Sequence, residues 1–123
     1  MTLDEYTNAA QRTSSEKYAA RTSEGVCMKQ LENGLMGLCG ESGECMEILK
    51  KHRHQCHPLD RAKLKEELGD VLWYVAEAAV GAGFTLDEIA RGNVEKLLTR
   101  YPAGFDPTRS VRRGGQGESP CER

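Results

Sequence analysis

The sequence predicts an all-α domain built from four main helices. Two Thr-Leu-Asp-Glu stretches, at residues 2–5 and 85–88, match the capping box that opens a helix. Apolar residues recur at helical spacing through residues 25–53 and again through 59–80. No alternating β-branched run bounded by turns marks a strand. We therefore expect an all-α fold in which the second and third helices pack antiparallel through a linker near residues 54–59.

Local signals set the expected helix boundaries. The sequence does not fix where the first helix ends, because the polar run at 13–15 is either a break or a polar turn of helix. The third helix should stop at the glycines at 81 and 83. The four helices are expected over residues 3 to a point between 15 and 24, 25–53, 59–80 and 85–98.

Two short segments carry acids three residues apart, which places both carboxylates of a pair on nearly the same side of a helix. The pairs are Glu41 with Glu44 and Glu67 with Asp70. Rotation by about 100° per residue sets these acids at the border of the apolar stripe. Acids beside a core are costly unless they are paired, protonated or neutralised by a cation. The four acids therefore indicate a metal site between facing helices, although a solvated acidic face is the simpler explanation for any single pair.

Glycines accompany these acids inside the predicted helices, at positions 37, 40, 43 and 69. Glycine in a helix interior costs roughly 0.5–1 kcal/mol relative to alanine. A helix that keeps several of them is expected to gain close approach to a neighbouring helix or to a ligand.

These segments resemble the all-α nucleoside triphosphate pyrophosphohydrolases of the MazG-like group, whose signature is E-x-x-E followed by E-x-x-D. Here the signature occupies residues 41–44 and 67–70, and all four acids are present. Residues 6–13 look like the opening helix of small members, and residues 93–105 look like their closing helix and tail. The resemblance covers about residues 1–110.

The resemblance implies a four-helix MazG-like bundle over residues 1–108, completed by association into a homodimer or homotetramer. The end of the chain is rich in Gly, Arg, Glu and Pro with little to bury, so we expect 109–123 to be a flexible tail. It implies Mg²⁺, or Mn²⁺ in its place, held by the four acids, which are then both the metal ligands and the catalytic residues. It also implies cleavage of a nucleoside triphosphate between the α- and β-phosphates, giving a nucleoside monophosphate and pyrophosphate. Removal of unwanted nucleotides and control of nucleotide pools both fit this activity.

Four further side chains are candidate substrate ligands. Tyr74 lies one turn beyond Asp70 in the same sector, where it is either a sugar or phosphate contact or a core aromatic. Asn93, Lys96 and Arg100 share one sector of the fourth helix, and the alternative there is a basic turn that complements the helix dipole. The resemblance favours phosphate binding for Lys96 and Arg100.

Composition excludes some partners. The 123 residues carry 17 Lys+Arg against 19 Asp+Glu, a net charge of −2, so the chain lacks the basic footprint of a nucleic-acid-binding protein. The sequence shows neither a leader pattern nor a long apolar run, and its five cysteines are an odd number without C-x-x-C spacing. We expect a soluble, cytoplasmic protein with reduced thiols and no membrane partner.

A zinc site, a di-iron site and a non-enzymatic role are the alternatives to this interpretation. The run His52 to His57 holds three histidines and a cysteine, but its spacing matches no usual zinc pattern, and Pro58 marks it as a linker. Di-iron carboxylate bundles use Glu-x-x-His, which neither acid segment contains. The rival function is a non-enzymatic helical interaction module whose acids are solvated. The sequence does not indicate which base or sugar is preferred.

Overall fold

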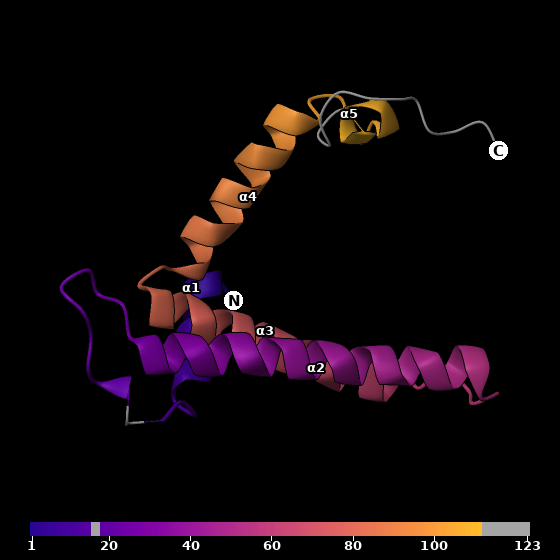
Figure 1. Cartoon of the computed structure of the whole chain (residues 1–123), viewed down its shortest axis with the longest axis horizontal. Helices are drawn as coiled ribbons and strands as arrows, with labels where there is room; N and C mark the ends of the chain where they lie inside the picture. Colours follow the sequence, from indigo (N-terminus) through magenta and orange to yellow (C-terminus); the bar gives the residue numbers. More distant parts are fainter. Residues whose placement is uncertain (16–17, 112–123) are drawn as a thin grey trace. The chain divides into compact units, whose positions relative to one another are not determined.

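The computed structural model describes residues 1–15 and 18–111 and shows no strand among them, so the predicted all-α class is confirmed (Figure 1). The chain divides into two compact units, residues 1–89 and the part from Ala90 onward, and each is described by itself. The single domain expected over 1–108 therefore stays a prediction. The described helices are α1 (Leu3–Gln11), α2 (Met28–His54), α3 (Arg61–Ala82), α4 (Leu86–Arg100) and α5 (Pro107–Val111).

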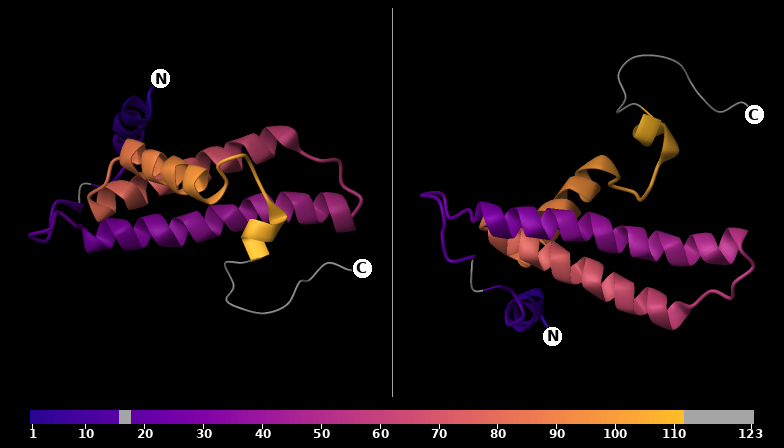
Figure 2. Two further views of the ribbon diagram at one scale, coloured as in Figure 1. Left: turned by 90° about the horizontal axis from the view of Figure 1, so that it is seen from above. Right: turned by 60° about the horizontal axis from the view of Figure 1, so that its bottom comes forward.

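The first unit is organised around an antiparallel hairpin of α2 and α3, which Figures 1 and 2 show as two long helices side by side. Small residues set its register. A side chain on Gly34 would collide with Ala78 on α3, and a side chain on Gly37 would collide with the Tyr74 ring. Near the open end, the backbone N–H of Cys27 donates to the carbonyl of Gly81 at 2.8 Å. This register brings the middle of α2, with its acid pair, opposite the first half of α3.

Both predicted capping boxes are present. Thr2 and Glu5 exchange hydrogen bonds at the start of α1, with donor–acceptor distances of 2.6 and 3.1 Å. Thr85 and Glu88 do the same at the start of α4, at 2.7 and 3.1 Å. Two backbone N–H groups that a helix start leaves without a partner are satisfied at each site.

The first helix is shorter than expected, since it ends at Gln11 and not between residues 15 and 24. The hydroxyl of Thr13 donates to the carbonyl of Ala10 at 2.8 Å, and the Trp73 indole N–H donates to the same carbonyl at 3.2 Å. Threonine and serine side chains compete in this way with backbone hydrogen bonds. Trp73 therefore packs against the end of α1, as a structural residue.

A fully buried acid, Glu77, connects α3 to the N-terminal segment. Its carboxylate accepts hydrogen bonds from Gln11 Nε2 at 2.8 Å, from Ser14 Oγ at 2.8 and 2.9 Å, and from Gln30 Nε2 at 3.2 Å. Arg21 extends the network, donating to Gln30 Oε1 at 3.3 Å. The network therefore joins the end of α1 and the segment after it to the hairpin, while Tyr6 of α1 packs against the small apolar cluster.

Replacing Glu77 by Gln should lower the free energy of unfolding by about 1–3 kcal/mol. The amide keeps the size of the side chain but turns an NH₂ group toward donors that need an acceptor, so buried polar groups lose their partners. Urea unfolding followed by circular dichroism measures the change. Glu32→Gln, on an exposed part of α2, is the matched control and should be within about 0.5 kcal/mol of the wild type.

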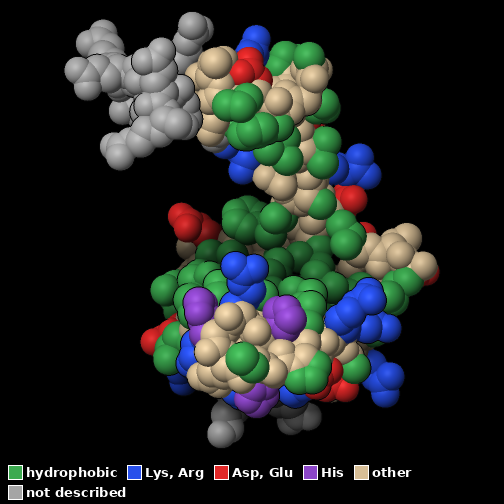
Figure 3. All heavy atoms as spheres, turned by 90° about the vertical axis from the view of Figure 1, so that its right-hand side faces the viewer, with side chains coloured by type: hydrophobic (Ala, Val, Ile, Leu, Met, Phe, Trp, Pro, Cys, Tyr) green, Lys and Arg blue, Asp and Glu red, His purple; other side chains and the backbone are tan. Residues whose placement is uncertain are grey.

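The histidine-rich run straddles the end of α2, because His52 and His54 lie in its last turn and His57 lies in the connection to α3. Figure 3 shows histidines gathered among Lys and Arg side chains. Cys56 adopts a positive φ of 57°, and His52 Nδ1 lies 2.9 Å from the carbonyl oxygen of His57. Within residues 1–15 and 18–111, these side chains form no group that could hold a metal ion. The linker between α2 and α3 begins only after His54, so the histidine-rich run lies only partly within it.

The expected C-terminal tail lies only partly within the residues that the structure describes. Residues 109–111 of the expected flexible tail belong to α5, and 112–123 lie outside the described residues. None of the described helices is both long enough and apolar enough to cross a membrane.

Candidate metal centre

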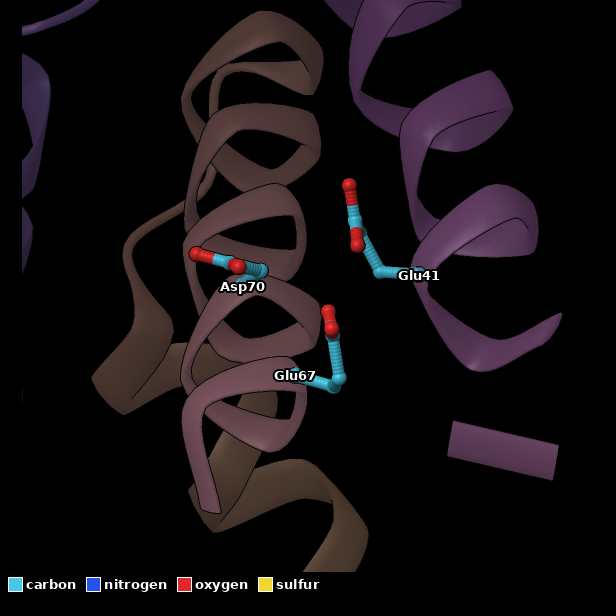
Figure 4. Close-up of side chains that lie close together, drawn as sticks. All are labelled: Glu41, Glu67 and Asp70. Carbon is cyan, nitrogen blue, oxygen red and sulfur yellow. The ribbon is translucent and has the colours of Figure 1, made fainter. Parts of the chain in front are cut away.

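Three of the four predicted acids come together between α2 and α3. One oxygen each from Glu41, Glu67 and Asp70 can be chosen so that all three lie within 4.8 Å of one another. Figure 4 shows Glu41 reaching from α2 toward Glu67 on α3, with Asp70 one turn further along that helix. Glu67 is buried, Glu41 is half-buried and Asp70 is exposed. The cluster therefore opens to solvent on one side.

The pKa of Glu41 is affected by the other acids of the cluster. Partial burial and the negative charges of Asp70 and Glu67 raise the pKa of Glu41, and its contact with Glu67 adds to the shift. Closely spaced carboxylates cannot all ionise without repulsion. A cation bound among them would remove that repulsion.

Glu44, the fourth predicted acid, is exposed one turn beyond Glu41 and lies outside the group of three. Its charge is near enough to contribute to the raised pKa of Glu41. The two share one face of α2, so Glu44 borders the cluster.

Tyr74 lies one turn beyond Asp70, as predicted, and packs against α2. Its ring occupies the space that the missing side chain of Gly37 leaves, and it meets Trp73 edge to face with ring centroids 4.9 Å apart. The packing role of Tyr74 is thus observed, and a substrate contact stays a prediction.

The other three predicted substrate ligands belong to the second unit. Asn93, Lys96 and Arg100 are exposed along α4. Their spacing of three and four residues puts them on one side of that helix. Their part in substrate binding also stays a prediction.

Comparison with known proteins bears on this geometry. The MazG nucleotide pyrophosphohydrolase domain matches residues 29–105, which is more than half of the chain. The chain belongs to the MazG family. The match includes α2 from its second residue onward, all of α3 and all four signature acids.

One relative of this MazG chain is the Gene 37 protein of Mycobacterium phage L5, which is 37% identical over 73 residues. That alignment covers 56% of this chain and 64% of the phage protein, so the chain spans a little under two thirds of its relative. No solved structure matches the chain.

Two residues near the MazG acids were not recognised from the sequence as part of their surroundings. Tyr6 of α1 lies close enough to Asp70 that burial and the Asp70 charge raise the pKa of its phenol. Lys63, one turn before Glu67, places Nζ 2.7 Å from Glu67 Oε1. The i, i+4 spacing of Lys63 and Glu67 could have indicated the pair, whereas nothing local in the sequence indicates that α1 approaches Asp70.

The donor set fits a hard divalent cation, because every available ligand atom is a carboxylate oxygen. Mg²⁺ binds oxygen at about 2.0–2.1 Å, so oxygens on opposite sides of one ion are about 4.2 Å apart. The three carboxylate oxygens lie within 4.8 Å of one another, so small side-chain rotations would bring them to Mg²⁺ ligand distances. Glu44 is the nearest further acid on α2 that could join the set.

Proposed function

We propose that this chain is a Mg²⁺-dependent nucleoside triphosphate pyrophosphohydrolase, which converts a ribo- or deoxynucleoside triphosphate into the monophosphate and pyrophosphate. The observation that carries the proposal is the convergence of Glu41, Glu67 and Asp70 inside a MazG domain. We place this activity in the cytoplasm, in the cleaning or control of nucleotide pools.

The acids are assigned the metal-binding and catalytic roles. Glu41, Glu44, Glu67 and Asp70 would hold Mg²⁺, with Mn²⁺ as a substitute. The ion would neutralise triphosphate charge and lower the pKa of an attacking water. One of the acids would take the proton of that water as a general base.

The substrate would be held by groups outside the acid cluster. Tyr74 lies on the acid-bearing face of α3, where a ring edge or hydroxyl suits a sugar. Lys96 and Arg100, with Asn93 beside them, offer charge-assisted hydrogen bonds to phosphate oxygens. The assignments of Lys96 and Arg100 rest on the family resemblance and on the side of α4 that they share with Asn93.

The decisive test is to supply a panel of ordinary and modified nucleoside triphosphates with Mg²⁺ and to identify both products. Pyrophosphate together with a monophosphate is the expected result. Release of inorganic phosphate with a diphosphate would instead mean that the other anhydride bond breaks. No turnover of any nucleotide, together with no stabilisation of the fold by Mg²⁺, would favour a helical interaction module.

We also propose a homodimer or homotetramer. Large apolar side chains on the hairpin remain at least 42% exposed, and they include Leu35 and Leu49 on α2 and Leu68 and Leu72 on α3. Helical spacing puts these four on the same side of the hairpin. Exposed apolar surface of this kind commonly marks a protein interface.

Light scattering at micromolar concentration should therefore give at least twice the chain mass, and Leu68→Glu should shift the protein toward monomer. Glutamate at the centre of an apolar contact would be desolvated without a partner. Glu95→Gln, an exposed change on α4, is the control and should leave the mass unchanged. A wild-type monomer would contradict the proposal.

A further inference from the structure

Lys63 is placed where the helix itself does not favour a lysine. It lies in the first turn of α3, and its backbone N–H donates to the capping carboxylate of Asp60 at 2.9 Å. Cations are unfavourable near a helix N-terminus, and a lysine four residues before a glutamate is the weaker order of that pair. The contact that accounts for Lys63 is its 2.7 Å ion pair with Glu67.

The ion pair joins the exposed ammonium of Lys63 to the buried carboxylate of Glu67. The side chain of Glu67 is only 8% exposed, whereas that of Lys63 is 53% exposed. Within residues 1–15 and 18–111, Lys63 is the one cation that forms an ion pair with any member of the acid cluster. It therefore supplies the positive charge that the three crowded carboxylates need when they hold no metal.

A second acid is available to the same ammonium. Glu66 Oε2 lies 3.6 Å from Lys63 Nζ, and the Glu66 side chain is 70% exposed, outside the cluster. A divalent ion on Glu67 would compete with Lys63 for the same oxygen and would repel its charge. The flexible lysine stem allows the ammonium to move to Glu66 without leaving α3.

We propose that Lys63 is the built-in counterion of the metal-free site, displaced toward Glu66 when a divalent cation binds Glu67, so that it sets the metal affinity of the cluster. The inference rests on the proposed function, because it takes the cluster to be a metal site. Lys63 is in this sense a positioning residue, and it acts on the ligand Glu67.

The test compares the wild type with Lys63→Met, measuring Mn²⁺ binding by calorimetry and melting temperature with and without metal, all in the absence of nucleotide. Without metal, Lys63→Met should melt about 2–4 °C lower, because the buried Glu67 loses its partner. Its Mn²⁺ affinity should rise about three- to tenfold, because competition and repulsion are gone. At saturating metal the two proteins should melt within about 1 °C of each other.

Two control variants make the test specific. Lys63→Arg keeps the cation and should behave like the wild type. Lys65→Met removes the same charge from another side of α3 and should leave both measurements unchanged. Unchanged or weaker metal affinity in Lys63→Met would overturn the inference while the proposed function stands. A wild type that binds no divalent cation would overturn both, and the metal titration of the wild type separates these two results.

Discussion

Replacing Glu41 by Gln or Asp70 by Asn should reduce the rate of pyrophosphate release at least about tenfold, which corresponds to roughly 1.4 kcal/mol of activation free energy. Glu67→Gln and Glu44→Gln should also lose at least about tenfold. Each change removes one negative ligand while nearly preserving shape, so the loss reports on charge at the site. Rates measured at saturating Mg²⁺ and nucleotide check the prediction.

The same substitutions should preserve or raise the stability of the metal-free protein, although they lower its activity. The pKa of Glu41 is raised by burial and by the charges of Asp70 and Glu67, so its ionised form is disfavoured in the folded protein. Glu41→Gln removes that repulsion and should raise the melting temperature in the presence of a chelator. The gain should shrink as pH falls through the raised pKa of Glu41, because protonation of the wild type relieves the same repulsion.

Glu47→Gln is the matched control for these acids. Glu47 is on α2 one turn beyond Glu44, and it pairs with Lys50 at 2.6 Å and with Lys51 at 3.6 Å. It should keep full turnover. Full activity in both Glu41→Gln and Asp70→Asn would exclude the proposed metal site, whereas loss of activity with a lower metal-free melting temperature would point to a structural role.

The acid cluster could be predicted from the sequence because its parts obey helical geometry. Glu67 and Asp70 share a helix face by spacing alone, and Glu41 reaches them once α2 and α3 form an antiparallel pair. The capping boxes were equally local, and both are present. Local rules were sufficient wherever the interacting groups lie within one turn of a helix.

Contacts between segments far apart in the sequence could not be predicted from helical spacing. Gln11 and Glu77 lie 66 residues apart, and their hydrogen bond depends on where α1 returns to the hairpin. The hydrogen bond from Trp73 to the Ala10 carbonyl at the end of α1 likewise joins residues 63 apart. Nor did the acid signature show that Glu44 would remain exposed while the other three converge.

Glycine was informative in the sequence, but its role differs from one position to the next. Close approach of a neighbour accounts for Gly37, which receives the Tyr74 ring. No atom outside their own helix backbone and adjoining residues comes within 4 Å of a side chain built at Gly40, Gly43 or Gly69. No neighbouring helix of this chain accounts for these three glycines, and close approach to a ligand there stays a prediction.

Gly34→Ala should be among the most destabilising single substitutions in the hairpin, lowering the free energy of unfolding by about 2–4 kcal/mol. An added Cβ would lie 2.5 Å from the backbone nitrogen of Ala78 and 2.8 Å from its Cβ. Backbone cannot move aside as a flexible side chain does, so α2 and α3 would have to separate along their contact. Urea unfolding monitored by circular dichroism measures the loss.

Gly43→Ala is the matched control, because it makes the same chemical change in the same helix where the added methyl meets nothing within 4 Å. It should stabilise the protein by about 0.5–1 kcal/mol, since alanine is the better helix former. The two substitutions thus have opposite expected signs that helix propensity alone cannot produce. Stabilisation by Gly34→Ala would mean that α2 and α3 do not pack in this register, and the placement of Glu41 opposite Asp70 would fail with it.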